Sequence, residues 1–208
     1  MENYYLFIFM AFMLIILPGP DTAVITKNTI SKRKAAGIQT TAGTLAALLI
    51  HTMAAVFGLS ALIVKSAFLF SILKYAGAIY LIYLGCISIL FIIKKQPQSA
   101  EVSEQVNKYG KESNFRQGFL TNLLNPKVAV FFLTFLPQFA GPGDQAFFEF
   151  LALGLTYTLL TMIWFFIYIY LIHLVSDFMK KPSTMKAVEG FTGGVLILFG
   201  LKLALEKN

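Results

Sequence analysis

The sequence predicts an all-α membrane protein with six transmembrane helices, arranged as two inverted three-helix repeats in which proline breaks helices 1 and 4. Three observations predict this fold class. Of the 208 residues, 57% are hydrophobic and 13% are charged, whereas about a quarter of the residues in a soluble domain are charged. The apolar residues gather in six long segments, and two of these segments carry a proline motif at corresponding positions.

Each apolar segment is near the roughly 20 residues that cross the hydrocarbon core of a bilayer. The segments fall near residues 4–26, 37–63, 67–93, 116–139, 147–173 and 187–205. The first begins behind Glu2, with no basic n-region and no small-residue cleavage site. We therefore expect it to stay in the protein as the first span and not to be removed as a signal peptide.

The connections between the segments carry most of the net charge of +7. Basic residues are concentrated in the first connection (Lys27, Lys32, Arg33, Lys34), the third (Lys94, Lys95, Lys108, Lys111, Arg116) and the fifth (Lys180, Lys181, Lys186). By the positive-inside rule these connections are cytoplasmic, and both termini then lie outside. Because the basic excess indicates orientation here, we expect the lipid bilayer, and no nucleic acid, as the partner.

The third connection divides the chain into two halves. Residues 96–114 are polar, which predicts a flexible cytoplasmic linker between a first three-helix repeat at residues 1–95 and a second at residues 115–208. Since three is an odd number, related halves must have opposite orientations, which is the plan of many secondary transporters. The stretch from Gly77 to Gly85 also aligns with that from Gly193 to Gly200 with one gap, which favours a repeat.

The first segment contains Pro18, Gly19, Pro20 and Asp21 in its interior. A regular helix cannot pass through two such prolines, and the backbone groups that a break frees are tolerated at membrane depth only beside protein or a water-filled cavity. Asp21 adds about 2.5–3.5 kcal/mol to the cost of insertion and needs a partner. We interpret the break as half of a transport site. The alternative is a proline kink with a carboxylate at the interface.

The fourth segment breaks in the same way at Asn125, Pro126 and Lys127. We expect Asp21 and Lys127 to be the only charged side chains well inside the spans. If Asp21 binds the ammonium and Lys127 the carboxylate of a small zwitterionic substrate, both charges are desolvated without being left unpaired. The half-helix N-termini after the breaks would present free N–H groups to the carboxylate. The alternative is a structural Asp21–Lys127 pair that holds the halves together.

Further polar residues extend the candidate substrate site. Asn122 lies one helical turn before Asn125, on the face of the break. In the second segment, Thr40, Thr44 and His51 recur at helical spacing on one face, which we expect to point inward. His51 is a proton-coupling candidate because the unperturbed pKa of histidine is near neutrality. The simpler alternative is a histidine that only satisfies a hydrogen bond near the interface.

The remaining polar and aromatic residues are less specific. In the fifth segment, Tyr157, Thr158 and Thr161 either line a polar seam or bond to their own helix. The many Phe and Tyr side chains are expected mostly to face lipid or the membrane interface.

Several motifs together resemble one transporter family. They are Pro18 to Asp21, the glycines from Gly37 to Gly43, Asn125 to Lys127, Phe131-Phe132, and Pro137 to Phe139. These motifs are similar to those of the lysine exporter (LysE/RhtB) family of bacterial amino-acid effluxers, and the resemblance covers nearly the whole chain. It implies a multi-pass carrier of the cytoplasmic (inner) membrane that exports amino acids or close derivatives, driven by an ion gradient. The chain departs from the family at Ala47, where a third glycine often sits.

The function favoured by the sequence is a secondary exporter driven by the proton gradient. A metal-ion or other small-solute exporter of a related fold is an alternative, but no His-rich or acidic loop that would collect an ion is present. An intramembrane enzyme is less favoured, because the chain has two histidines, the single cysteine Cys86, and no HExxH or GxSxG motif. We expect no catalytic residue, cofactor or metal. The sequence leaves open the substrate, the coupling ion and whether the chain forms a homo-oligomer.

Overall fold

The structure, a computed structural model, describes residues 4–59, 67–94, 113–140, 145–172, 174 and 181–205. Within these ranges the chain is helical and contains no strand. The elements are α1 (Tyr4–Ile16), α2 (Pro20–Lys32), α3 (Lys34–Ala54) with the π-helix η1 (Ala55–Leu59), α5 (Ala67–Lys94), α7 (Asn114–Leu123), α8 (Pro126–Val130) with the π-helix η2 (Phe131–Phe135) and the 3₁₀-helix η3 (Leu136–Phe139), α9 (Ala146–Tyr170) and α11 (Pro182–Leu205).

The helices are of the kind that crosses a membrane. Lys34–Gly58 and Ala146–Tyr170 are each long and apolar enough to do so alone. The pair α1 and α2, and the pair formed by α7 with Pro126–Phe139, also qualify if each bent pair is one span. The predicted all-helical membrane class is therefore confirmed, while the count of six spans and the inverted repeat stay predictions. Residues 96–112 of the predicted linker lie outside the described residues. The division into repeats at 1–95 and 115–208 therefore also stays a prediction.

Both predicted helix breaks are present. The axis bends by 53° between α1 and α2, and by 49° between α7 and the helix that starts at Pro126. Pro20 and Pro126 stand at the first positions of α2 and α8, where the missing N–H would have had no intrahelical partner. Gly19 is the N-cap of α2 and has no side chain to cap it, whereas the Asn125 side chain accepts from the Lys127 N–H at 3.0 Å.

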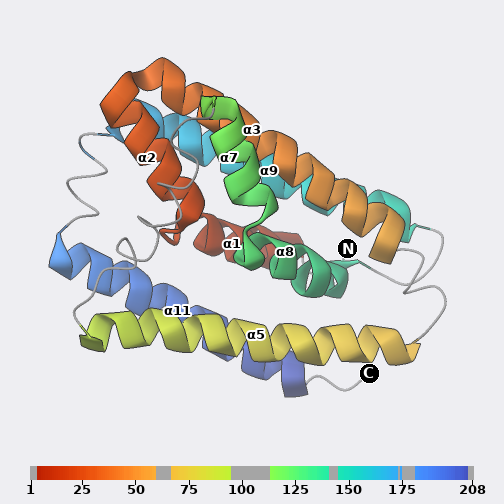
Figure 1. The fold of residues 1–208 in the computed structure, drawn as a ribbon. Helices are drawn as coiled ribbons and strands as arrows, with labels where there is room; N and C mark the ends of the chain where they lie inside the picture. The colour runs from red at the N-terminus through yellow and green to blue at the C-terminus, as the bar shows by residue number, and fades with distance from the viewer. Residues whose placement is uncertain are drawn as a thin grey trace.

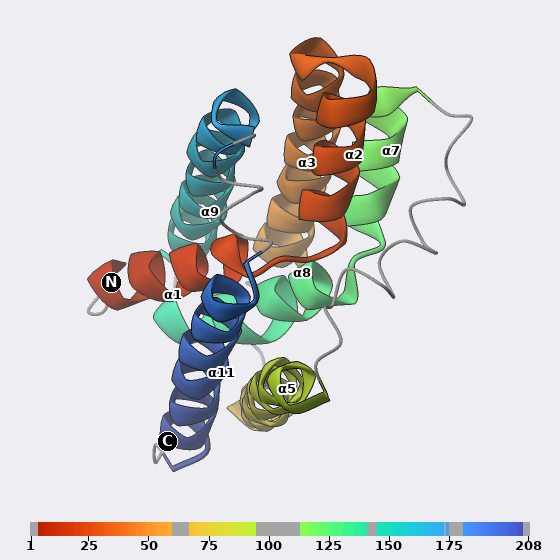
Figure 2. The same cartoon turned by 90° about the vertical axis from the view of Figure 1, so that its left-hand side faces the viewer.

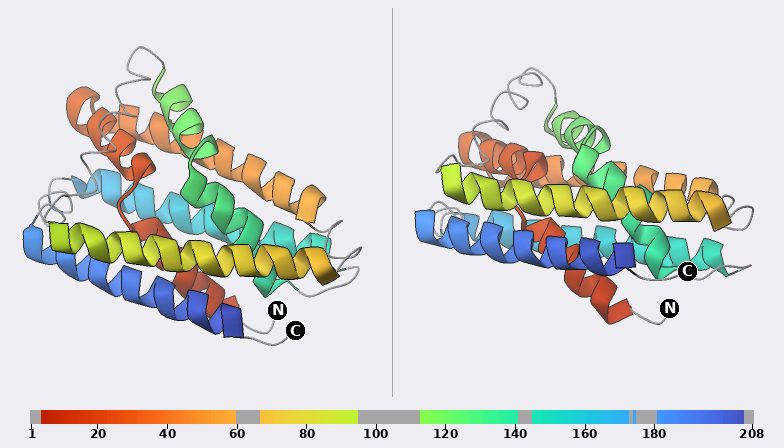
Figure 3. Two further views of the ribbon diagram at one scale, coloured as in Figure 1. Left: turned by 60° about the horizontal axis from the view of Figure 1, so that its bottom comes forward. Right: turned by 90° about the horizontal axis from the view of Figure 1, so that it is seen from below.

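The long helices form two layers around the broken ones. Figure 1 shows α3 and α9 along one side, α5 and α11 along the other, and α1 and α8 between them. Seen end-on in Figure 2, α1 crosses between these layers, while α2 and α7 lie beside α3. Figure 3 shows α5 and α11 side by side, and both chain ends at the same end of the molecule. That common end agrees with an even number of passes.

An aromatic cluster fills the centre of the core. Phe131 lies 4.8 Å from Phe135 and 4.6 Å from Tyr157 between ring centroids, and Phe7 packs edge-on to Phe139 at 5.4 Å. All five rings are buried. These five rings are exceptions to the expectation that the aromatic residues mostly face lipid or the membrane interface. They lie on inward faces of α1, α9, η2 and η3, and burial of large apolar surface stabilises the packing of those elements.

Candidate functional site

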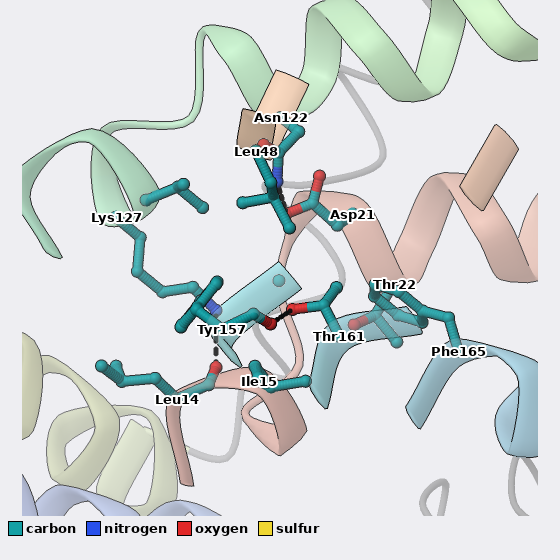
Figure 4. Close-up of a pocket in the computed structure, with 12 residues that line it drawn as sticks. Leu14, Ile15, Asp21, Thr22, Leu48, Asn122, Lys127, Tyr157, Thr161 and Phe165 are labelled. Atoms are coloured by element: carbon teal, nitrogen blue, oxygen red, sulfur yellow. Dashed lines mark hydrogen bonds between the residues drawn. The ribbon is translucent and has the colours of Figure 1, made fainter. Parts of the chain in front are cut away.

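The two helix breaks meet at one pocket near the middle of the molecule. The pocket is partly open and has a volume of about 20 Å³, which is enough for about one water molecule in this conformation. Its walls are Leu14, Ile15, Gly19, Asp21, Thr22, Leu48, Asn122, Lys127, Val128, Tyr157, Thr161 and Phe165 (Figure 4). Both charged residues predicted for the site therefore line a single small cavity.

Asp21 is held by amides from the second half of the chain. Its Oδ2 accepts hydrogen bonds from Asn122 Nδ2 and Asn125 Nδ2, each at 3.1 Å. Its Oδ1 is buried and has no hydrogen-bond partner. A buried carboxylate is tolerated when its oxygens accept hydrogen bonds. One oxygen of Asp21 thus stays available to a donor in the pocket.

Lys127 is held by the broken end of α1. Its Nζ donates to Leu14 O at 3.2 Å and to Leu17 O at 3.3 Å, and Figure 4 shows this side chain reaching from α8 to the Leu14 carbonyl. Leu14 O is free because its regular helical donor would be the N–H of residue 18, which proline lacks. The negative end of α1 also favours a cation. An ammonium has three donors, so one N–H of Lys127 remains for a ligand.

Asp21 and Lys127 do not contact each other directly. Among the described residues no hydrogen bond or ion pair joins them, although their charges interact electrostatically. Each is stabilised instead by the helix break of the other half. The direct structural pair that the sequence left open is therefore not formed in this conformation, and the pocket lies between two separated charges of opposite sign.

The glycine and prolines of the motifs shape this geometry. Gly19 lies against Lys127, because a Cβ added at Gly19 would stand 3.2 Å from Nζ. Pro18, Pro20 and Pro126 do not line the pocket but create the two breaks. The expected free N–H groups are present at only one break, because Asn125 already caps α8 while α2 has no side-chain cap.

The polar residues of α3 lie beside the pocket and not in its walls. Thr40 is fully buried and bonds to Ala36 O and to Asn28. Thr44 is buried and its hydroxyl has no partner. His51 Nε2 lies 3.5 Å from Asn122 O and its ring stacks on Phe132 at 5.6 Å. A regular helix would bond Asn122 O to the N–H of residue 126, again a proline; here Asn122 O accepts from the Asn125 N–H at 2.9 Å.

Some residues of the site carry weak sequence signals or none. Tyr157 and Thr161 line the pocket, and the Thr161 hydroxyl also donates to Tyr157 O of its own helix. The polar seam and the bond within the helix, which the sequence offered as alternatives, are therefore both present. Thr22 follows Asp21 directly and has no distinguishing signal of its own. Glu189 is a further charged residue, not among those predicted from the sequence; it is buried within α11 and its Oε1 has no partner. It lies near the start of its segment, so the expectation that Asp21 and Lys127 are the only charges well inside the spans stays a prediction. Its position two residues inside the sixth apolar segment is the one signal that could have found it.

No cluster suited to a metal ion is formed by the part of the chain that the structure describes, where no three His, Cys, Asp or Glu side chains come together.

Comparison with known proteins gives a consistent result. The sequence profile of the family described as LysE type translocator matches residues 12–207. The uncharacterized membrane protein YrhP of Bacillus subtilis is 35% identical over 211 residues, which cover 99% of this chain and 100% of YrhP. The homoserine/homoserine lactone efflux protein of Salmonella typhimurium is 27% identical over 210 residues, covering 100% of this chain and 98% of that protein. The uncharacterized membrane protein PA4757 of Pseudomonas aeruginosa is 25% identical over 204 residues, covering 97% and 94%. No solved structure matches the chain significantly.

Proposed function

This chain belongs to the LysE type translocator family, and we propose on that premise that it exports amino acids or close derivatives across the bacterial cytoplasmic membrane as a secondary transporter. A translocator moves its solute without changing it, so we assign no catalytic residue. The homoserine/homoserine lactone efflux protein, 27% identical over the full chain, supports a small amino-acid-like solute.

The observation that carries this proposal is the separation of Asp21 from Lys127 across the pocket. Each keeps one open position, Oδ1 of Asp21 and the third N–H of Lys127. A zwitterion offers an ammonium to the first and a carboxylate to the second. In the pocket, both charges of the zwitterion would be paired with a protein charge. This pairing offsets the free-energy cost of removing the two charges from water.

The rest of the pocket suits a small side chain. Leu14, Ile15, Leu48 and Phe165 supply apolar walls, while Thr22, Tyr157 and Thr161 supply hydroxyl groups. This lining favours neutral amino acids with short apolar or hydroxylated side chains as the solutes. The pocket, with a volume of about 20 Å³ in this conformation, has to widen to admit one. Asn122, Asn125, Gly19 and the three prolines hold the charged groups in place.

We assign the driving force to protons and His51 to their transfer. The His51 ring contacts the carbonyl of Asn122, whose side chain binds Asp21. Protonation of His51 would therefore act on the residue that orients the carboxylate, and histidine titrates in the range of a physiological proton gradient.

Efflux from purified protein in liposomes tests the function. Vesicles are loaded with labelled homoserine, and labelled lysine and glutamate serve as solutes of net charge. We expect homoserine to leave unchanged, faster with an imposed proton gradient, and faster than either charged amino acid. Release equal to that from protein-free vesicles for all three solutes, or release of a chemically altered product, would contradict the proposal. Equal rates with and without the gradient would contradict the role of protons alone.

A further inference from the structure

A file of polar side chains continues from the pocket along the interface of α2, α3 and α7. Asn28 lies two helical turns beyond Asp21 on α2, about 10 Å further along the axis. Its Nδ2 donates to Thr40 Oγ1 of α3 at 2.9 Å and to Gln117 Oε1 of α7 at 3.1 Å. All three side chains are buried. A buried amide network at this depth needs a reason, because apolar packing would hold the same helices without its cost.

The file reaches the end of these helices that is far from the breaks. There Lys32 Nζ donates to Asn114 Oδ1, and Asn114 Nδ2 donates to Gln39 Oε1, both at 2.9 Å. Figures 1 and 2 show α2 and α7 side by side between this end and the breaks. Side chains of α2 and α7 therefore bond at three levels, at Asp21, at Asn28 and at Lys32.

Unpartnered oxygens mark the same file. Asn28 Oδ1 and Thr44 Oγ1 are buried without a hydrogen-bond partner, as are Asp21 Oδ1 and Asn122 Oδ1 at the pocket. Thr40, Thr44 and Leu48 are spaced by one helical turn along one face of α3. Since Leu48 lines the pocket and Thr40 bonds to Asn28, Thr44 lies between these two levels. Buried acceptors without donors are costly, so they indicate a donor that is present at another stage.

We propose that the interface of α2 with α3 and α7 is the path of the solute between the pocket and the lysine-bearing end of the molecule. The path is closed in this conformation by the side-chain bonds between α2 and α7. When it opens, the oxygens of Asn28 and Thr44 accept hydrogen bonds from the N–H groups of the solute, which selects solutes that carry an ammonium group. This inference rests on the proposed export function and names its route.

The geometry points to α2 as the helix that separates. A Cβ at Gly43 would collide with the backbone of Phe115, and one at Gly118 with the backbone of Thr40, so α3 and α7 touch backbone to backbone. The bonds between α2 and α7 are made by side chains alone. The ends of α2 are also discontinuous, at the proline break and at Arg33, where a φ of 121° stops the helix.

Reversible cross-linking tests the path with a control at the same site. Cysteines replace Lys32 and Asn114 in one variant and Gln39 and Asn114 in the other, both carrying Cys86→Ser, and a short bifunctional thiol reagent joins each pair. The first link ties α2 to α7, and the second ties α3 to α7, which need not separate. We expect homoserine efflux to fall to the protein-free level only with the first link, and to return on reduction.

The outcomes separate this inference from the proposed function. Efflux by both variants before cross-linking shows that the export function holds, and its absence in wild type would remove that function itself. If neither link lowers efflux in its own variant, the path is overturned. If each link abolishes efflux in its own variant, the path is also overturned, because opening would then not be confined to α2.

An isosteric substitution tests the acceptor role separately. Thr44→Val removes an unpartnered hydroxyl, while the control Thr52→Val removes a hydroxyl on the same helix that already bonds to Leu48 O. We expect Thr44→Val to slow homoserine efflux by about tenfold or more, as loss of a hydrogen bond to a charged group predicts, and Thr52→Val to change it little. Equal rates in the two variants would overturn the assignment of Thr44 to the path.

Discussion

At the scale of single residues, the two buried charges are each stabilised by the opposite half of the chain. Asp21 binds the amides of Asn122 and Asn125, and Lys127 binds the carbonyl groups of Leu14 and Leu17. Neither charge therefore depends on the other for its hydrogen bonds. This arrangement lets the two charges be removed one at a time without leaving the remaining one wholly unpaired.

We predict that Asp21→Asn and Lys127→Met each fold and each lose export. Removing one charged contact to the substrate costs about 1.5–3 kcal/mol, which is roughly a 10- to 150-fold loss of binding. Folding is expected to survive, although Lys127→Met leaves two carbonyl groups without a donor. Efflux of homoserine per amount of correctly folded protein, judged by size-exclusion profile, is the measurement.

The double variant Asp21→Asn/Lys127→Met distinguishes binding from structure. If the two charges only hold the halves together, removing both relieves the burial of charge, and part of the efflux should return. If they bind the two ends of a zwitterion, the double variant folds and still fails to export. Near wild-type efflux by a well-folded double variant would rule out the binding role.

Gly19 offers a second prediction at this scale. A Cβ at this position would stand 3.2 Å from Lys127 Nζ, so Gly19→Ala should push the amine aside by a few tenths of an ångström and lower efflux while the fold stays intact. Gly194→Ala is the matched control, because a Cβ there meets no atom within 4 Å. Equal efflux by the two alanine variants would show that Gly19 does not fix the position of Lys127.

The charged residues of the site were predictable from the sequence, whereas the file on α2 was not. Asp21 and Lys127 stand out because a charge inside an apolar segment is costly and rarely kept without a function, and each of these lies beside a proline. Asn28 and Gln117 lie in ordinary polar stretches near the basic first and third connections, and only helix packing brings them together. Glu189 could not be recognised in the same way, because it lies near the start of its segment, where the burial of a side chain depends on its neighbours.

At the scale of elements, the prolines act by freeing particular carbonyl groups. Pro18 cannot donate to Leu14 O, which then accepts from Lys127. Pro126 cannot donate to Asn122 O, which accepts instead from the Asn125 N–H at 2.9 Å and lies 3.5 Å from His51 Nε2. The first break therefore leaves a carbonyl of α1 to a side chain of another element, and the second redirects a carbonyl of α7.

We predict that replacing both Pro18 and Pro20 with alanine leaves a folded protein with little export. The N–H restored at position 18 would bond to Leu14 O within the helix and compete with Lys127. Pro18→Ala alone should account for most of the loss, since the N–H of the first helical position, where Pro20 stands, has no intrahelical partner. Efflux by the double variant, by Pro18→Ala and by Pro20→Ala is the measurement, and unchanged efflux by the double variant would show that the break is a simple kink.

The elements themselves were the most predictable part of the fold. The described part of each apolar segment is helical apart from the breaks, and the breaks fall at the predicted prolines. The ends differ by a few residues, since α2 continues to Lys32 and α11 begins at Pro182, because polar residues prolong a helix beyond its apolar part. The π-helices at Ala55 and Phe131 had no signal in the periodicity of the sequence.

At the scale of the whole molecule, corresponding helices of the two halves pack on one another. The contacts join α3 to α9 and α5 to α11, while the broken helices pack differently, with α7 against α3 and α2. Gly85 lies against α11 at Gly193, and Gly200 lies against α5 at Ala78, so the two glycine stretches that the sequence aligns face each other. An inverted repeat would produce these pairings, and the two similar bends of 53° and 49° agree with it. The repeat itself stays a prediction until the orientation of each span is measured.

The orientation of the chain in the membrane decides whether the path along α2 is the entrance or the exit of the solute. The basic residues of the first, third and fifth connections predict that Ser99 and Lys181 face the cytoplasm and Gly143 the outside; positions 99 and 143 lie outside the described residues. Single cysteines at these positions, in a chain carrying Cys86→Ser, can be treated in intact cells with a thiol reagent that does not cross membranes. We expect modification at 143 alone, and at 99 and 181 only after permeabilisation. Modification from outside at 99 with protection of 143 would reverse the orientation. The lysine-bearing end of α2 would then open to the outside, and the path from the pocket would be the exit of the exported solute and not its access from the cytoplasm.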